Sequence, residues 1–108
     1  EIVRRIREAV GGKTDLCVDA NCGYPTPRDA IRIIRAMEEY RLKYAEQPVE
    51  GIDRMADVTR AIATPVMADE SAWGARDGPR AFSATSMGRW KPASAISPTS
   101  IWPPRQCR

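Results

Sequence analysis

Three segments of the chain carry apolar residues at helical spacing, with charged residues between them. The pattern predicts amphipathic helices over residues 1–10, about 27–40 and 53–63. Gly11-Gly12 ends the first helix, and Thr26 and Pro27 supply an N-cap and a suitable first residue for the second. The apolar positions are Ile2, Val3, Ile6 and Val10 in the first helix, Ile31, Ile34 and Met37 in the second, and Met55, Val58 and Ile62 in the third.

Short apolar stretches lie between and after these helices. Residues 15–21 ("DLCVDAN"), 42–48 ("LKYAEQP") and 65–68 ("PVMA") are expected to form strands. Helices and strands then alternate with short connections, which is typical of parallel strands joined by helical crossovers. The sequence therefore predicts an α/β fold of about three consecutive βα units.

The alternation stops after Ser71. Residues 72–108 contain five prolines, five serines, all three tryptophans and no sustained apolar period, so they are not expected to form helices or interior strands. Residues 1–71 carry 11 basic and 13 acidic side chains, whereas residues 72–108 carry six and one. We expect one domain over residues 1–73 and a basic, irregular C-terminal tail over 74–108 that is disordered or read out of frame.

Composition narrows the classes of function. A chain of 108 residues suits about one small domain, and its net charge of +3 is too small to indicate a nucleic-acid partner. No stretch is long and apolar enough for a membrane span. Three cysteines without a CxxC motif and no histidine exclude a Cys/His zinc site. We expect a cytoplasmic protein and, because the chain starts at Glu1 within a helical pattern, a piece of something longer.

An acidic residue lies near the end of each predicted strand. Asp19, Glu46 and Asp69 are 27 and 23 residues apart, about one βα unit each. The carboxyl ends of parallel strands share one rim, so these three side chains are expected to converge there. Taken singly, each has an ordinary explanation as a capping or strand-ending residue. Together they predict a hard divalent cation, Mg²⁺ or Mn²⁺, bound by oxygen ligands.

The motifs "VDAN", "YAEQPVE" and "MADES", in this order and spacing, resemble the barrel of the enolase superfamily. The resemblance is to the mandelate racemase/muconate lactonizing enzyme family, in its muconate cycloisomerase and dipeptide epimerase branch. It covers about residues 1–73. It implies a partial (β/α) barrel around the third to fifth strands of the family's (β/α)₇β barrel.

The resemblance also implies roles for individual residues. Asp19, Glu46 and Asp69 would bind Mg²⁺, while Asn21, Gln47 and Glu70 would orient these ligands or face a small carboxylate substrate. The family's shared step removes a proton α to a carboxylate, and the metal stabilises the resulting enediolate. Racemases or epimerases, cycloisomerases and dehydratases share this step.

The acid/base lysines of that family are not found at matching positions. A Lys-x-Lys pair would precede Glu1. The second lysine would follow Asp69 by about two dozen residues, where Lys91 is a candidate by distance, although Pro92 argues against a strand there. Lys43 should point away from Glu46 because it lies three residues earlier on the same strand. We therefore expect a metal-binding barrel fragment that is inactive alone.

Two further classes of function fit parts of the sequence. Six basic residues alternate with Trp73, Trp90 and Trp102 in the tail, a composition that can bind single-stranded nucleic acid. Alternatively, a non-catalytic half-barrel could associate with another copy through its open sheet edges.

Of the remaining residues, Cys17 should share the side of Asp19 as a small core residue. In the following loop, Cys22 either faces the substrate or is an ordinary loop thiol, and Tyr24 either lines the site or packs against the protein.

Overall fold

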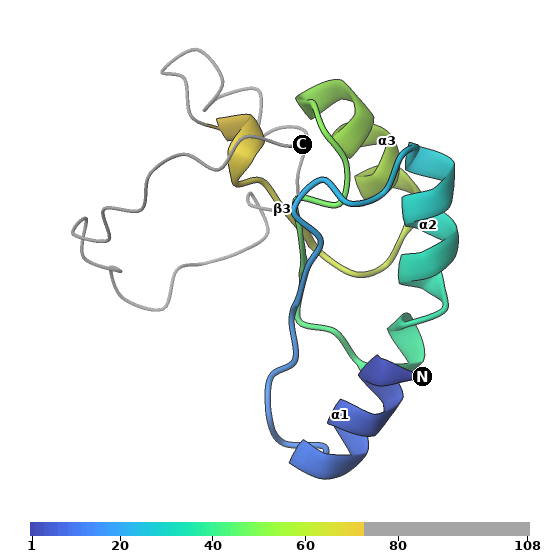
Figure 1. Cartoon of the computed structure of the whole chain (residues 1–108), viewed down its shortest axis with the longest axis vertical. Coiled ribbons are helices and arrows are strands. Elements are labelled where there is room, and N and C mark those ends of the chain that lie inside the picture. The colour runs from blue at the N-terminus through green and yellow to red at the C-terminus, as the bar shows by residue number, and fades with distance from the viewer. Residues whose placement is uncertain (73–108) are drawn as a thin grey trace, which may run out of the picture.

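The computed structural model describes residues 1–72, which form three consecutive units of helices and parallel strands (Figure 1). The predicted tail, Lys91 and the tryptophan-containing basic segment lie outside the described residues. The elements are α1 (Ile2–Val10), β1 (Val18–Asp19), α2 (Pro27–Arg35), β2 (Ala45–Glu46), α3 (Ile52–Ala61) and β3 (Val66–Met67), with 3₁₀ turns η1 (Glu38–Tyr40) and η2 (Glu70–Ala72).

The strands form one parallel sheet in the order β1-β2-β3. Their regular parts are two residues long, shorter than the predicted strands, but the hydrogen bonding extends further. The N–H of Lys43 donates to the carbonyl of Leu16 at 2.8 Å, and the N–H of Ala20 donates to the carbonyl of Glu46 at 3.0 Å. The predicted order of helices and parallel strands is confirmed.

The two faces of the sheet differ in character. Helices α2 and α3 cover one face (Figure 1), and the buried side chains lie between these helices and the sheet. The core consists of Ala30, Ile34, Ala45, Val49, Met55, Val58, Val66 and Ala68. Because side chains alternate along a strand, Glu46 and Met67, which follow the core residues Ala45 and Val66, point to the opposite, open face.

Helix α2 begins as the sequence predicts and ends earlier. The Thr26 side chain accepts a hydrogen bond from the N–H of Asp29 at 3.1 Å, and Pro27 occupies the first turn. The helix stops at Arg35 instead of continuing to residue 40, and the chain tightens into η1. Arg41 then takes a left-handed conformation with φ 55°. After this turn the chain runs beside β1, where the N–H of Lys43 donates to the carbonyl of Leu16.

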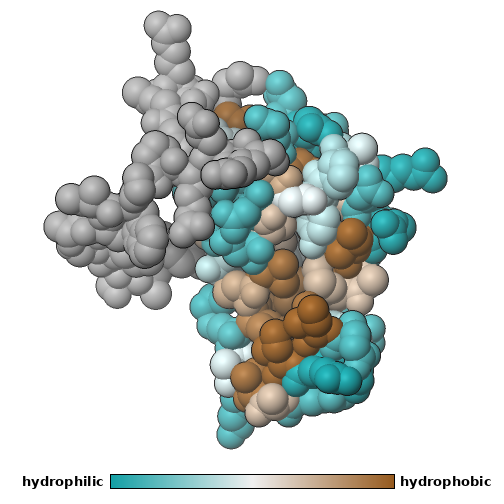
Figure 2. All heavy atoms as spheres, in the orientation of Figure 1, coloured by the Kyte–Doolittle hydropathy of each residue, from teal (hydrophilic) through white to brown (hydrophobic). Residues whose placement is uncertain are grey.

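Helix α1 leaves its apolar side uncovered. Ile2, Ile6 and Val10 are 75%, 42% and 41% exposed, and they lie four positions apart on one side of the helix. Figure 2 shows the resulting apolar surface over α1. The helix ends at Gly11, whose φ of 73° suits a glycine. The predicted amphipathic helix is therefore present, but its apolar side does not join the core.

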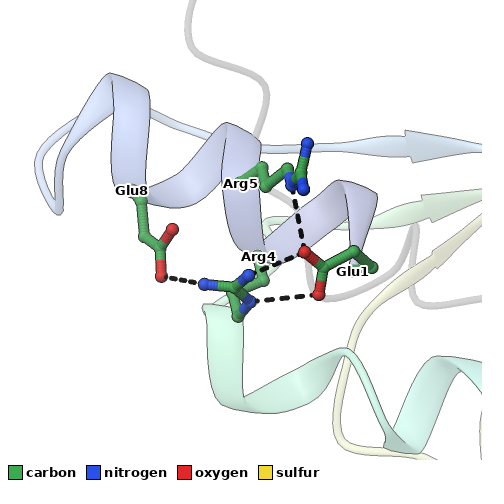
Figure 3. Close-up of polar contacts among 4 residues, drawn as sticks. All are labelled: Glu1, Arg4, Arg5 and Glu8. Atoms are coloured by element: carbon green, nitrogen blue, oxygen red, sulfur yellow. Dashed lines mark hydrogen bonds and ion pairs between the residues drawn. The ribbon is translucent and has the colours of Figure 1, made fainter.

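The polar side of α1 is held by ion pairs within the helix (Figure 3). Arg4 lies between Glu1, at 2.7 Å, and Glu8, at 2.6 Å, and Arg5 also contacts Glu1 at 3.0 Å. Arg7 instead donates to backbone carbonyls near η1, including that of Tyr40 at 2.9 Å. These arginines thus stabilise the helix and anchor it to the turn before β2.

Candidate metal centre

Three carboxylates lie on the open face of the sheet at the carboxyl ends of its strands. Asp19 and Glu46 are register partners across β1 and β2, and Glu46 is the register partner of Met67 on β3. Asp69 follows Met67 by two residues, in the bend after β3, and its negative charge acts on Glu46. The sheet register thus aligns two acidic residues on neighbouring strands, and the third follows the end of the next strand.

The charges of these residues act on one another. The pKa of Glu46 is raised by its partial burial and then by the negative charges of Asp19, Asp69 and Glu70. Each of these raises the pKa by disfavouring the charged carboxylate. A cation placed among the four groups would reverse the effect, so this end of the sheet is electrostatically suited to a positive ion.

The acidic side chains at the strand ends are not arranged as a coordination shell. Within residues 1–72, no three His, Cys, Asp or Glu side chains are close enough to hold a metal ion. Asp19 is turned toward its own loop, where its Oδ1 accepts the N–H of Asn21 at 3.1 Å. This is an Asx-type contact, an ordinary local role for an aspartate at the end of a strand.

The donor set nevertheless fits Mg²⁺. It consists of carboxylate oxygens alone, the ligands that hard divalent cations prefer. Glu70 adds a further oxygen: its Oε2 is buried and has no hydrogen-bond partner in the described part of the chain. These oxygens come from the ends of three neighbouring strands, and binding would require their side chains to turn toward one ion.

Gln47 follows Glu46 and lies completely buried. Its Nε2 donates to the carbonyl of Val49 at 2.8 Å and to the Ser71 hydroxyl at 2.7 Å. Its Oε1 accepts the N–H groups of Asp69 at 2.9 Å and Ser71 at 3.2 Å. Every hydrogen bond available to the amide is therefore made within the protein, so its contacts fit the orienting role better than the substrate-facing one.

Ser71 is a residue that sequence reasoning missed. Its hydroxyl accepts from Gln47 and also from the N–H of Gly51 at 3.2 Å, so it joins the loop after β3 to the start of α3. The available signal was a serine two positions after Asp69 in "ADES". A spacing of 24 residues from Gln47 gives no local pattern, however, and only the fold brings the two together.

The other candidates occupy different places. Lys43 pairs with Asp15, away from Glu46 as predicted, and Lys13 is exposed in the turn after α1. Cys17 is a free, exposed thiol, so its predicted core role is wrong: the open face has no layer above it within residues 1–72. Its hydrogen bond with Tyr44, followed by burial, raises the pKa of Tyr44 to about 12.

The loop after β1 is a tight turn. Asn21 and Cys22 both have positive φ, 46° and 58°, and the N–H of Gly23 donates to the carbonyl of Ala20 at 2.7 Å. A Cβ at position 23 would lie 2.6 Å from that carbonyl oxygen, which explains the glycine. Tyr24 packs against the core, the packing alternative of the two expected for it.

Alternating helices and parallel strands, with acids at the carboxyl ends, define a segment of a (β/α) barrel. The chain belongs to the enolase C-terminal domain-like family, whose match covers residues 1–94. It is 42% identical over 77 residues to the hydrophobic dipeptide epimerase of Enterococcus faecalis, covering 69% of this chain and 22% of that protein.

Solved structures agree with this assignment. A mandelate racemase/muconate lactonizing family protein from Azoarcus sp. EbN1 superposes with a TM-score of 0.72 at 38% identity, over 77% of this chain and 22% of that one. The Enterococcus faecalis V583 dipeptide epimerase complexed with Mg and the dipeptide L-Leu-L-Tyr gives a TM-score of 0.66 at 42% identity, over 69% and 22%. The chain thus spans about a fifth of the length of these relatives.

No helix in residues 1–72 is long and apolar enough to cross a membrane.

Proposed function

We propose that this chain supplies the Mg²⁺-binding rim of an enolase-superfamily epimerase or racemase. Asp19, Glu46 and Asp69 would hold the ion, and Mn²⁺ would serve in its place. The observation that carries the proposal is the sheet register, which aligns Asp19 with Glu46 beside the end of β3, where the charge of Asp69 also acts on Glu46. Membership of the family and the Mg complex of a similar dipeptide epimerase support it.

The substrate class follows from the same chemistry. A bound Mg²⁺ would hold a substrate carboxylate and offset the negative charge that develops on it when the α-proton leaves. The residues of this chain would fix the ion on one side of the rim, next to the half-buried Glu46. A small carboxylate with an α-proton is therefore the proposed substrate class, and the similarity to dipeptide epimerases favours a dipeptide.

We further propose that the chain does not transfer the proton by itself. Lys13 and Lys43 are the lysines within residues 1–72, and their places in the turn after α1 and beside Asp15 keep both from the acidic rim. The assay is α-proton exchange into deuterated water on dipeptides with Mg²⁺. Absence of exchange by the chain is expected, and steady exchange would contradict this part of the proposal.

Metal binding is tested by calorimetric titration and thermal denaturation with Mg²⁺ and Mn²⁺. A cation that binds the folded chain at 100 times its dissociation constant stabilises it by about 2.7 kcal/mol. Asp19→Asn should abolish this stabilisation, while Asp57→Asn, which alters an exposed acid on α3, should preserve it. Equal responses of both variants would refute the proposed site.

A second candidate is association of two copies. The exposed side chains of Ile2, Ile6 and Val10 on α1 favour association, because a second copy that covers this apolar surface lowers the free energy of the pair. Analytical ultracentrifugation distinguishes the cases: a concentration-dependent dimer supports association, and a monomer at every concentration excludes it.

A further inference from the structure

Gln47 connects the two strands that carry Glu46 and Asp69. It follows Glu46 directly in the chain, and its Oε1 accepts the N–H of Asp69 at 2.9 Å. We infer that Gln47 and Ser71 form a lock that fixes Asp69 relative to Glu46 and so sets the cation affinity of the rim. The inference rests on the proposed Mg²⁺ site and assigns both residues as positioning residues.

The first support is the completeness of the hydrogen bonding. The Gln47 carbonyl receives two backbone N–H groups, those of Asp69 and Ser71, and its amide donates to Val49 and to the Ser71 hydroxyl. A buried amide with all its bonds made is held in a single orientation, since any rotation leaves polar groups unpaired. The backbone of residues 69–71 is therefore fixed around it.

The second support is the backbone conformation of Gln47. Its φ is 37°, in the left-handed region, and Pro48 follows it. Non-glycine residues adopt this region at a cost, and a strained residue persists only where its surroundings hold it. Here the turn ends β2 directly after Glu46 and brings the amide under the loop that carries Asp69.

The third support is the position of Ser71 in the network. Its hydroxyl accepts from Gln47 at 2.7 Å and from the N–H of Gly51 at 3.2 Å. The lock therefore joins the loop after β2, the start of α3 and the loop after β3. A displacement of either strand end would break at least one of these bonds, which makes the Glu46–Asp69 spacing resistant to the repulsion between the two carboxylates.

If Gln47 and Ser71 had only a structural role, replacing them would lower the stability of the fold without changing the Mn²⁺ affinity of the molecules that remain folded. The test compares Mn²⁺ affinity, measured by titration and corrected for the folded fraction, in the full 108-residue chain. Gln47→Met keeps most of the side-chain volume and removes the bonds. Ser71→Ala is the milder variant. Val58→Ala is the control for a general loss of stability, because Val58 is buried on α3 among the core residues.

We expect Gln47→Met to weaken Mn²⁺ binding by about 10–100-fold, as is typical when a partner that orients a ligand is removed. Ser71→Ala should weaken it less, and Val58→Ala should leave it unchanged. Unchanged affinity in both Gln47→Met and Ser71→Ala would overturn the lock while leaving the proposed metal site intact. Absence of binding by the unmodified chain would overturn the proposed function itself.

Amide hydrogen exchange gives a second readout that does not depend on the metal. In the unmodified chain the Asp69 N–H should exchange slowly because it donates to Gln47. Gln47→Met should accelerate its exchange at least tenfold relative to amides of α3 in the same variant. Equal exchange of the Asp69 amide in both proteins would contradict the lock even if the variant remains folded.

Discussion

Asp19 of β1 and Glu46 of β2 are register partners in a parallel pair of strands, so two carboxylates lie on the same side of adjacent strand ends. Like charges placed this way oppose folding, and the raised pKa of the half-buried Glu46 reflects both its burial and its acidic neighbours. The arrangement is unfavourable for the chain alone and favourable around a cation, which is why we interpret it as a binding site.

Replacing Glu46 by glutamine should separate stability from binding. Because burial and neighbouring charges disfavour the ionised carboxylate, Glu46→Gln should make the metal-free chain more stable at neutral pH. The same change removes a proposed ligand and should abolish stabilisation by Mg²⁺. Urea denaturation with and without Mg²⁺ measures both effects. A variant that is less stable without metal, or that still responds fully to Mg²⁺, would contradict the interpretation.

Met55 should be one of the most sensitive core positions. It is completely buried on α3 among the residues that join α2, α3 and the sheet. Met55→Ala should lower the free energy of unfolding by about 2–5 kcal/mol, as large-to-small core substitutions do. Chemical denaturation measures the loss, with Arg54→Ala on the exposed side of the same helix as the comparison. A loss below about 0.5 kcal/mol, the range of surface changes, would place Met55 outside the core.

Ile6 should behave in the opposite way although it is also a large apolar residue on a helix. It is 42% exposed on α1, so Ile6→Gln should change the free energy of unfolding by no more than about 0.5 kcal/mol. If two copies associate through α1, the same substitution should weaken that association in sedimentation measurements. A large loss of stability in a strictly monomeric protein would show that this side chain is covered.

Thr26 should contribute through its capping bond. Its hydroxyl oxygen accepts the N–H of Asp29 at the start of α2, so Thr26→Ala should cost about 1 kcal/mol of stability. Thr26→Ser keeps the acceptor and should cost much less. Thermal denaturation of both variants makes the comparison, and equal losses would show that packing of the threonine methyl, not the cap, is responsible.

The sequence predicted the order of elements because its local signals are strong. Thr26 and Pro27 define the start of α2, Gly11 ends α1, and the apolar spacing of Met55 and Val58 identifies the buried side of α3. The placement of an acid at each strand end also follows from pattern alone, since parallel strands present their carboxyl ends on one rim.

Other features depend on contacts between distant parts of the chain. The stop of α2 at Arg35 and the exposure of Cys17 follow from how the chain returns to the sheet and from which face is covered. The left-handed backbone of Gln47 and its bonds to Ser71, 24 residues later, have no local sequence signal. The orienting role expected for Gln47 rests on resemblance and stays a proposal, and its hydrogen bonds to Asp69 and Ser71 are the contacts that support it.

The most direct test of the central claim is a crystal structure of the chain grown with Mn²⁺ and examined by anomalous scattering. We predict a single ion bound by one carboxylate oxygen from each of Asp19, Glu46 and Asp69, at about 2.1–2.2 Å, close to the distances typical of Mg²⁺. An ion bound elsewhere, or these three carboxylates on different sides of the sheet, would contradict the account.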